Sequence, residues 1–403
     1  MPRQTATGKT ARAAISSTHS RSASTNQSAP PSKPRIALVL QGGGALGAYQ
    51  AGVYEALHEH ELTPDWVVGT SIGAINAAII AGNPREQRIE RLRQFWDTVS
   101  HSDAVNLQQV PDATRQMATW LTTMDTFVRG VPGFFSPRAF NPFAMGLAVE
   151  PEQASFYNTD ELRTTLNNHV DFDYLNSSQA MRLTVSAVKV TCGTLVKFDS
   201  AKQVLSAEHI MASGALPPGF APVRIDGDLY WDGGLYSNTP LEAVLNDEAR
   251  QDTLCMMVDL WHADGPEPRT LEAIQTRQKD VTFASRSQRH IDSYIKQHQL
   301  RQMVRAAYAR LPREQITAAE HEQLSQLGVD ATIHVVRLPY AGRDWNMASK
   351  DVNFSRGSIQ WRWQQGYQDA LRGIALSHDC HFDAADGGVV VHELPPPKAT
   401  SAG

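Results

Sequence analysis

The 403-residue sequence has few cysteines, no excess of basic charge and no long apolar run. Its cysteines, Cys192, Cys255 and Cys380, are widely spaced, so their spacing indicates neither a disulfide framework nor a metal cluster. The formal net charge of -5 gives no reason to expect a nucleic-acid partner, because a polyanion is normally bound by a basic surface. The longest near-apolar run, 73–82, is interrupted by Asn76 and is about half the length of a membrane-spanning helix. We therefore expect no transmembrane helix.

Residues 1–34 differ in composition from the rest of the chain. They contain five basic residues and no acidic one, among many Ser, Thr, Ala and Pro residues. Such a segment cannot bury enough apolar surface to become ordered, which predicts a disordered tail. It has no continuous apolar stretch of a secretory signal, although its Arg and Ser content is also compatible with a transit peptide. We expect a protein that is cytoplasmic or peripheral to a membrane.

Apolar segments near the start of the chain alternate between strand and helix patterns. Residues 36–40 and 66–68 are typical of buried strands, and residues 45–57 and 72–81 are typical of helices. Alternation at this spacing predicts an α/β fold, a three-layer sandwich with a mainly parallel central sheet.

The remaining pattern predicts further elements and three boundaries. We expect a first domain over 35–262, a mainly helical C-terminal extension over 263–378 and a flexible tail over 379–403. A helix is predicted after Asn158, which would cap it with Glu161 at the third helical position. The other expected elements are helices at 85–99, 271–311 and 354–374, strands at 181–190, 195–198, 254–260 and near 332–338, and a hairpin at 223–230 turning at Asp226-Gly227.

A loop-rich segment, 120–145, concentrates aromatic residues among Gly and Pro. Three interpretations remain open for it. The aromatic side chains can cover an apolar pocket, form a surface that touches lipid, or pack onto the core.

The stretch 41–47, Gln-Gly-Gly-Gly-Ala-Leu-Gly, joins the first strand to the first helix. Its spacing fits the Gly-x-Gly-x-x-Gly loop that binds a dinucleotide, and its three consecutive glycines suit an oxyanion hole equally well. A dinucleotide site needs an acidic residue about 20 positions later, at the exit of the second strand. Asp65 lies at the entrance of that strand, which weakens the nucleotide interpretation.

The exit of the second strand carries Gly69-Thr70-Ser71-Ile72-Gly73, a Gly-x-Ser-x-Gly sequence. In a nucleophile elbow the serine occupies a strained turn, and the residues two before and two after it must be very small. Ser71 could alternatively be an ordinary N-cap residue. Since both loops leave neighbouring strand ends, backbone amides of Gly43 and Gly44 can converge on the space beside the Ser71 hydroxyl, where an oxyanion would develop.

A nucleophilic serine needs a base, and two kinds of candidate are present. Six late histidines fit the order serine, acid, histidine: His262, His298, His334, His378, His381 and His392. The other candidate is Asp232, which follows a strand and precedes Gly233-Gly234, so that its carboxylate has room to face a neighbouring loop. An Asp before two glycines can also be a simple turn former.

Together and in this order, these motifs resemble those of the patatin-like phospholipases. The segment 212–220, Ala-Ser-Gly-Ala-Leu-Pro-Pro-Gly-Phe, resembles that family's block before the aspartate, and 350–355 with 360–363 is similar to a C-terminal extension of one bacterial subgroup. The resemblance implies a dyad without histidine, in which Ser71 attacks an ester carbonyl and Asp232 accepts its proton and later activates water. It also assigns the oxyanion hole to Gly42, Gly43 and Gly44. No metal-ligand spacing is evident in the sequence and this chemistry does not require calcium, so we expect no metal or cofactor. The further motif glycines are Gly47, Gly69, Gly73, Gly233 and Gly234.

The resemblance implies a hydrolase of lipid carboxylic esters, similar to phospholipase A or a lysophospholipase, with possible contact at a membrane surface. Leu46 stands where many family members have Arg or Lys, so the sequence does not define the headgroup. The alternatives are an esterase or thioesterase with a Ser-His-Asp triad, and a non-catalytic lipid-binding or scaffolding protein. The sequence does not indicate an oligomeric state.

Overall fold

The first strand, β1 (Arg35–Leu40), is apolar along its length because it lies inside a sheet with both faces covered. The computed structural model describes residues 33–101, 124–247, 251–308, 310–312, 317–320, 322, 331–342, 349–382 and 388–394. The other strands of this sheet are β2 (Trp66–Gly69), β5 (Arg182–Lys189), β6 (Leu195–Asp199), β7 (Val223–Ile225), β8 (Asp228–Asp232), β9 (Thr253–Asp259), β10 (Thr332–Pro339) and β11 (Gly388–Glu393).

The strand order in the described part of the chain is β11-β10-β9-β1-β2-β5-β8-β7, with β6 also paired to β5. The six strands from β11 to β5 run parallel, and β6, β7 and β8 form antiparallel pairs. A second, small sheet pairs β3 (Ser136–Pro137) with β4 (Tyr157–Asn158). The predicted mainly parallel sheet is therefore confirmed.

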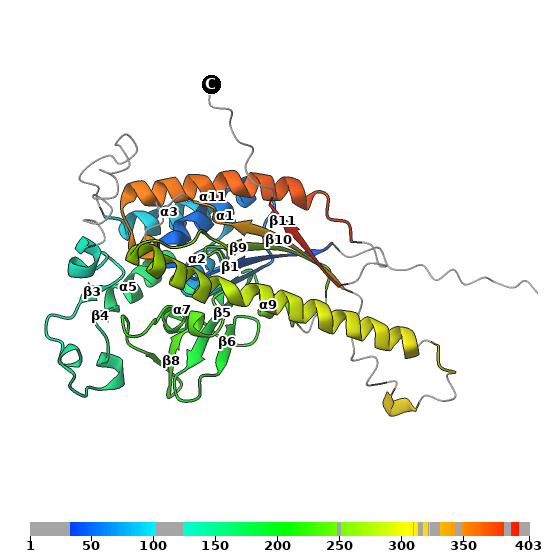
Figure 1. Cartoon of the computed structure of the whole chain (residues 1–403), viewed down its shortest axis with the longest axis horizontal. Coiled ribbons are helices and arrows are strands. Elements are labelled where there is room, and N and C mark those ends of the chain that lie inside the picture. Colours follow the sequence, from blue (N-terminus) through cyan, green and yellow to red (C-terminus); the bar gives the residue numbers. More distant parts are fainter. Residues whose placement is uncertain are drawn as a thin grey trace, which may run out of the picture. The chain divides into compact units, whose positions relative to one another are not determined.

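Helices cover both faces of the sheet (Figure 1). The principal helices are α1 (Ala48–Glu59), α2 (Ile72–Ala81), α3 (Arg88–Thr98), α5 (Asp160–His169), α6 (Phe172–Leu175), α7 (Ala207–Ser213), α8 (Leu241–Leu245), α9 (Leu271–Tyr308) and α11 (Arg356–Ser377). Along β1, Leu38 and Leu40 face a core shared with α1, α2, α3 and α11. Ala37 and Val39 face a smaller core shared with α8 and α9. These three layers match the predicted sandwich.

The expected boundary at residue 262 does not separate two domains. β10 extends the sheet in parallel with β9, and α11 packs against α1. The backbones of the two helices come so close that a Cβ atom at Gly52 would collide with the Trp363 carbonyl, and one at Gly366 with the Tyr49 carbonyl. The extension therefore belongs to the same compact unit, Pro34–Gly403.

The prediction of a flexible tail over 379–403 is wrong for Gly388–Glu393, which forms β11. This strand pairs in parallel with β10, and its Val389 and Val391 pack against the smaller core. Three consecutive valines favour an extended, partly buried strand, a signal that the composition of the surrounding tail obscured. Residues 395–403 and the predicted tail residues 1–32 lie outside the described residues.

Two local predictions had different outcomes. The Asp226-Gly227 turn is confirmed, since both residues have positive φ angles, 49° and 87°, as a two-residue hairpin turn requires. The predicted cap of α5 is wrong, because Thr159 occupies the N-cap position. Asn158 instead accepts a bond from the Asp160 amide at 3.0 Å, and the Glu161 carboxylate accepts one from the Gly133 amide at 2.9 Å.

The helices of the described residues include none that combines the length and the apolar character needed to cross a membrane.

Candidate active site

Ser71 lies in a strained turn between β2 and α2. Its φ and ψ angles are 57° and -126°, and its side chain makes no capping bond to the helix. A Cβ atom at Gly69 would collide with the Gly73 carbonyl, and one at Gly73 with the Leu40 carbonyl. The two glycines are therefore needed for the turn itself, as a nucleophile elbow requires.

The ends of β2 and β8 point toward each other along the same side of β5. β2 pairs in parallel with β5 up to Gly69, opposite Val185, and β8 pairs antiparallel with β5 down to Asp232, opposite Ala187. β6 occupies the other side of β5. The carboxyl ends of β2 and β8 thus pair with positions that are two residues apart along β5. This topology brings the chain at Ser71 toward Asp232.

Asp232 is 2% exposed and accepts a hydrogen bond from the Gly234 amide at 2.7 Å. Burial raises the pKa of Asp232 to about 7, although the Gly234 amide and the Ser71 hydroxyl both stabilise the carboxylate. A carboxyl group with this pKa is a far better base near neutral pH than an exposed aspartate.

The segment 212–220 connects the serine and the aspartate. The Ser71 amide donates to the Ser213 carbonyl at 3.0 Å, and the Asp232 amide donates to the Ala215 carbonyl at 3.0 Å. The same segment continues along the wall of the cavity beside Ser71. It therefore fixes the positions of both backbones relative to each other.

The three glycines after Gln41 do not have equivalent amides. The Gly42 amide donates to the Asn238 carbonyl at 3.1 Å, so it is not directed at the cavity as the sequence suggested. Among the described residues, the amides of Gly43 and Gly44 have no acceptor. Both residues line the cavity with Ser71, so two amides, rather than three, are available to an oxyanion.

Three polar or aromatic side chains hold the glycine loop, and the sequence analysis missed them all. The Gly42 carbonyl accepts hydrogen bonds from the side-chain amide nitrogen of Asn238 at 3.0 Å and from the indole nitrogen of Trp261 at 2.8 Å. Gln41, fully buried, accepts from the Trp261 backbone amide at 3.0 Å and donates to Thr239 at 2.7 Å. A polar residue directly after a buried strand, as Gln41 is, was the available signal for this role.

A cavity of about 290 Å³ opens beside Ser71 and Asp232. Phe127, Phe134 and Phe135 from the predicted aromatic segment line it, which confirms the pocket-covering interpretation for these residues. Phe135 also belongs to the larger core and Phe134 packs against it, so the core-packing interpretation is confirmed for these two. Residues 120–123 lie outside the described residues. Within the described part of the chain, no histidine lines the cavity. Its other large apolar side chains include Ile72, Ile75, Phe220 and Phe354.

Asp65 lies at the opposite end of β2 from Ser71. Its carboxylate accepts a bond from the Ile36 amide at 2.8 Å, where β1 begins. Asp65 therefore lies where β1 begins, whereas the glycine loop follows the end of β1. This position excludes Asp65 as the ribose ligand of a dinucleotide site.

Comparison with known families agrees with this geometry. A family model described as Patatin-like phospholipase matches residues 38–245, and one described as Patatin phospholipase matches residues 281–381. The chain belongs to the patatin-like phospholipase family. The resemblance identified from the motifs is thereby confirmed, and the second match covers most of the predicted extension.

Individual relatives of this patatin-like chain match only parts of it. Patatin-like phospholipase domain-containing protein 6 of Mus musculus is 29% identical over 209 residues, 51% of this chain and 12% of the relative. Triacylglycerol lipase ptl3 of Schizosaccharomyces pombe is 44% identical over 59 residues, 15% of this chain and 12% of the lipase. The chain thus spans about an eighth of the length of these relatives.

Solved structures with a similar arrangement include VipD from Legionella pneumophila and human GIVD cytosolic phospholipase A2. VipD is 14% identical with a TM-score of 0.38, covering 86% of this chain and 68% of VipD. The phospholipase is 11% identical with a TM-score of 0.36, covering 86% of this chain and 59% of the other.

In this patatin-like chain, the C-terminal extension forms part of the cavity wall. The short helix η8 (Lys350–Val352) lies against the glycine loop, because a Cβ atom at Gly44 would collide with the Asp351 carbonyl. Arg362, fully buried, donates to the Lys350 carbonyl at 2.8 Å and the Asn353 carbonyl at 3.0 Å. The extension therefore positions backbone next to the candidate oxyanion hole.

Ion pairs with α9 hold η8 from its other side. Lys350 contacts Asp280 at 2.8 Å, and Asp351 contacts Lys279 at 2.8 Å. Leu46 itself is fully buried in the larger core. The Leu46 side chain therefore packs inside the protein and does not line the cavity.

Proposed function

We propose that the chain is a serine acyl hydrolase that cleaves carboxylic esters of lipids through Ser71 and Asp232. The Ser71 oxygen attacks the ester carbonyl, and the Asp232 carboxylate accepts the hydroxyl proton. The carbonyl oxygen becomes an oxyanion that the amides of Gly43 and Gly44 stabilise. Asp232 then returns the proton to the departing alcohol, leaving an acyl group on Ser71.

The second half of the reaction uses the same residues. Asp232 accepts a proton from water, and the resulting hydroxide attacks the acyl carbonyl. When the tetrahedral intermediate collapses, the proton returns to the Ser71 oxygen and the fatty acid leaves. The sum is ester plus water giving acid plus alcohol.

The observation that carries this proposal is the meeting of the β2 and β8 ends at one cavity. It places a serine on a strained elbow, a buried carboxyl with a pKa of about 7 and two unpaired backbone amides around the same space. Each of these features costs stability, and together they suit acyl transfer.

The cavity favours an ester with one bound acyl chain. Its volume of about 290 Å³ is at the lower end for small-molecule pockets, roughly 300 to 1,000 Å³. Phenylalanine and isoleucine side chains form much of its wall, which suits a hydrocarbon chain. A lysophospholipid, or one acyl chain of a phospholipid or acylglycerol, is therefore the proposed substrate class.

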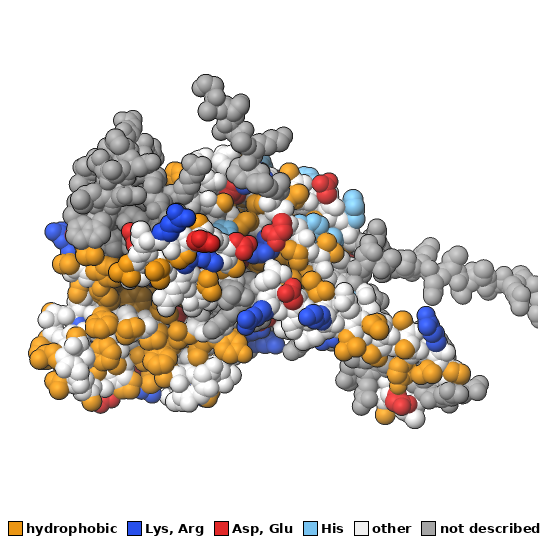
Figure 2. Space-filling model, viewed as in Figure 1, with side chains coloured by type: hydrophobic (Ala, Val, Ile, Leu, Met, Phe, Trp, Pro, Cys, Tyr) orange, Lys and Arg blue, Asp and Glu red, His pale blue; other side chains and the backbone are white. Residues whose placement is uncertain are grey.

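The surface beside the cavity supports contact with a lipid layer. Phe127 lines the cavity and is also 48% exposed, and Phe140 and Met145 of the same segment are 78% and 71% exposed. Figure 2 shows hydrophobic side chains gathered over the part of the molecule that carries β3 and β4. We include this surface in the proposal as the side that approaches a membrane.

The alternative with a Ser-His-Asp triad receives no support from the site. A catalytic histidine would have to reach Ser71, and in the described residues none borders the cavity. His262 contacts the Tyr340 carbonyl at 2.5 Å, and His334 lies between β11 and the segment after α11.

Covalent labelling tests the proposal directly. A fluorophosphonate probe should label the wild-type chain at Ser71, and Ser71→Ala should abolish labelling. Ser71→Ala and Asp232→Asn should each lower ester hydrolysis by roughly 10³-fold or more, as loss of a nucleophile or its base does. Ser178→Ala, at an exposed serine, is the matched control and should behave as the wild type.

Two results would overturn the proposal. One is hydrolysis that survives in Ser71→Ala, and the other is full activity in Asp232→Asn with loss on replacing one histidine. A substrate panel of phospholipid, lysophospholipid, acylglycerol and short p-nitrophenyl esters then ranks the headgroups and chain lengths.

A further inference from the structure

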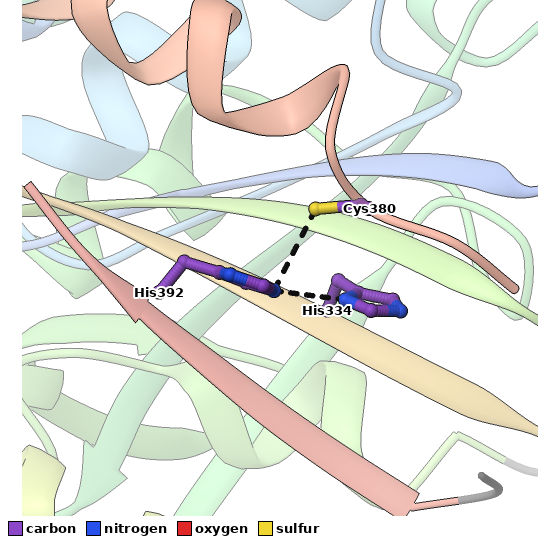
Figure 3. A group of neighbouring side chains, drawn as sticks. All are labelled: His334, Cys380 and His392. Carbon is purple, nitrogen blue, oxygen red and sulfur yellow. Dashed lines mark hydrogen bonds between the residues drawn. The ribbon is translucent and has the colours of Figure 1, made fainter.

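Three potential metal ligands come together at the edge of the sheet, away from the cavity. His334 lies on β10, His392 on β11, and Cys380 in the segment that follows α11 (Figure 3). A ligand atom of each residue lies within 4.8 Å of the other two. This group could not be predicted from the sequence, because parallel pairing of β10 with β11 joins residues whose spacing matches no metal motif.

The hydrogen bonds of His334 leave one of its ring nitrogens available as a ligand. Its Nε2 is 3.0 Å from the His381 carbonyl oxygen, which can only accept, so Nε2 carries the ring proton. Its Nδ1 is therefore unprotonated and faces His392 Nε2 at 2.8 Å. An imidazole that donates one N–H to a backbone carbonyl while presenting the other nitrogen is the usual arrangement of a zinc-binding histidine.

Two of the three separations between the ligand atoms are close to those of a tetrahedral zinc site, and the third, between Cys380 and His334, is within 4.8 Å. Zinc bonds of about 2.3 Å to sulfur and about 2.0 Å to nitrogen place a sulfur and a nitrogen ligand about 3.5 Å apart, and two nitrogen ligands about 3.3 Å apart. Cys380 Sγ lies 3.6 Å from His392 Nε2, which fits without movement. The pair of nitrogens at 2.8 Å would have to separate by about 0.5 Å, a small rotation of one imidazole.

The surroundings also suit a structural ion. The His334 ring is 6% exposed and makes an edge contact with Phe382, with ring centroids 4.7 Å apart. Cys380 and His392 are half-buried. Two imidazoles and one thiolate form a soft ligand set that favours zinc over magnesium or calcium.

We propose that His334, Cys380 and His392 bind a zinc ion, with water in the fourth position. On binding, the Cys380 thiol releases its proton to solvent, and His392 carries its ring proton on Nδ1 instead of Nε2. The ion connects β10, the edge strand β11 and the segment after α11. It fixes the C-terminal strand to the sheet, and it is independent of the hydrolytic site.

Metal analysis of the full chain tests the proposal. The wild-type chain, purified without chelators, should contain about one equivalent of zinc after desalting. Cys380→Ser and His392→Asn should each lose it. Cobalt substitution should give a thiolate-to-cobalt charge-transfer absorption in the wild type that Cys380→Ser lacks. Cys192→Ser, at an exposed cysteine outside the group, is the matched control and should keep both the zinc and the absorption.

Stability supplies a second readout. Chelation should lower the unfolding temperature of the wild type and of Cys192→Ser, and should leave folded Cys380→Ser unchanged. Equal zinc contents in wild type and Cys380→Ser would overturn the proposal. So would a correctly folded wild type that takes up neither zinc nor cobalt, which would leave the three side chains as a hydrogen-bonded group.

Discussion

At the scale of single residues, Asp232 determines how the proposed reaction depends on pH. Its carboxylate is the active form, and burial raises its pKa to about 7. We expect kcat/KM to rise about tenfold per pH unit below that value and to level off above it. The check is a pH-stat assay of a soluble short-chain ester from about pH 5 to about pH 9. A profile that stays level down to pH 5 would contradict the role of Asp232.

The same carboxyl group should weaken the fold. Its folded pKa, about 7, lies above its ordinary value of 3.8, so between these values the folded chain binds more protons than the unfolded chain. Stability is therefore lost as the pH rises from about 4 to about 7. At pH 8 we expect Asp232→Asn to be more stable than wild type, with a free energy of unfolding roughly 2 to 4 kcal/mol larger.

Denaturant unfolding at two pH values measures this difference. The gain of Asp232→Asn over wild type should shrink as the pH falls from about 8 to about 5, because the wild-type carboxyl becomes protonated. Asp173→Asn, at an exposed aspartate, is the control and should show no such gain. A destabilised Asp232→Asn at pH 8 would show that the charge is not the unfavourable feature.

Ser71 and Asp232 could be predicted from the sequence because their chemistry requires small neighbours, and glycines are visible in a sequence. The role of Gly42 could not. Its amide is turned toward the Asn238 carbonyl, and Asn238 lies 196 positions away in the chain. Which backbone amides remain unpaired depends on the tertiary structure, and local sequence does not encode it.

At the scale of elements, η8 connects the C-terminal extension to the candidate oxyanion hole. Arg362 donates to two carbonyls that flank this turn, one from each of two guanidinium nitrogens. A lysine has a single ammonium nitrogen and lacks this planar pair of donors, so it cannot reproduce both bonds. We expect Arg362→Lys to lower kcat by roughly 10- to 100-fold, because a displaced glycine loop misaligns its amides. Arg362 is thus a positioning residue.

The assay must separate this effect from simple loss of folded protein. Active sites are therefore counted with the fluorophosphonate probe, and kcat is expressed per labelled site. Arg356→Lys, at an exposed position of the same helix, is the control. If kcat per labelled site in Arg362→Lys equals that of wild type, Arg362 contributes only to stability.

Elements with strong periodicity were predicted well, and those that depend on a distant partner were not. The helix at 72–81 has the predicted bounds, because its apolar and small residues extend over the whole element. β11 and η8 are short, and contacts with distant parts of the chain hold each of them in place. β11 pairs with β10, and η8 is bound by Arg362 and by α9. Their sequences alone resemble tail and loop.

At the scale of the whole molecule, the sheet itself explains why the domain boundary was misplaced. The catalytic motifs end at Gly234 and the strand predicted at 254–260 follows them, so the first domain was expected to end directly after that strand. β9 would then have been an edge strand with unpaired amides and carbonyls. β10 and β11 extend the sheet past β9, and α11 covers α1, so the hydrolase part and the extension share their two cores.

The exposed apolar side chains of the aromatic segment, within residues 124–145, should decide whether the protein acts on lipid in vesicles. Phe140 and Met145 are mostly exposed, and burying such a side chain in a lipid layer contributes about 1.5 to 3 kcal/mol. We expect Phe140→Ser combined with Met145→Ser to weaken binding to phosphatidylcholine vesicles at least about tenfold. Hydrolysis of vesicle lipid should fall in parallel, whereas turnover of a soluble short-chain ester should not change.

Co-sedimentation with vesicles and the two hydrolysis assays measure these effects on the same preparations. Val204→Ser is the matched control, because Val204 is 73% exposed but lies outside the aromatic segment. An equal loss on both substrates would mean that the double variant damages the cavity. Only burial in the lipid layer links Phe140 and Met145 to vesicle hydrolysis. Unchanged vesicle binding would therefore mean that the protein binds vesicles through another surface, or that it takes up single lipid molecules from solution.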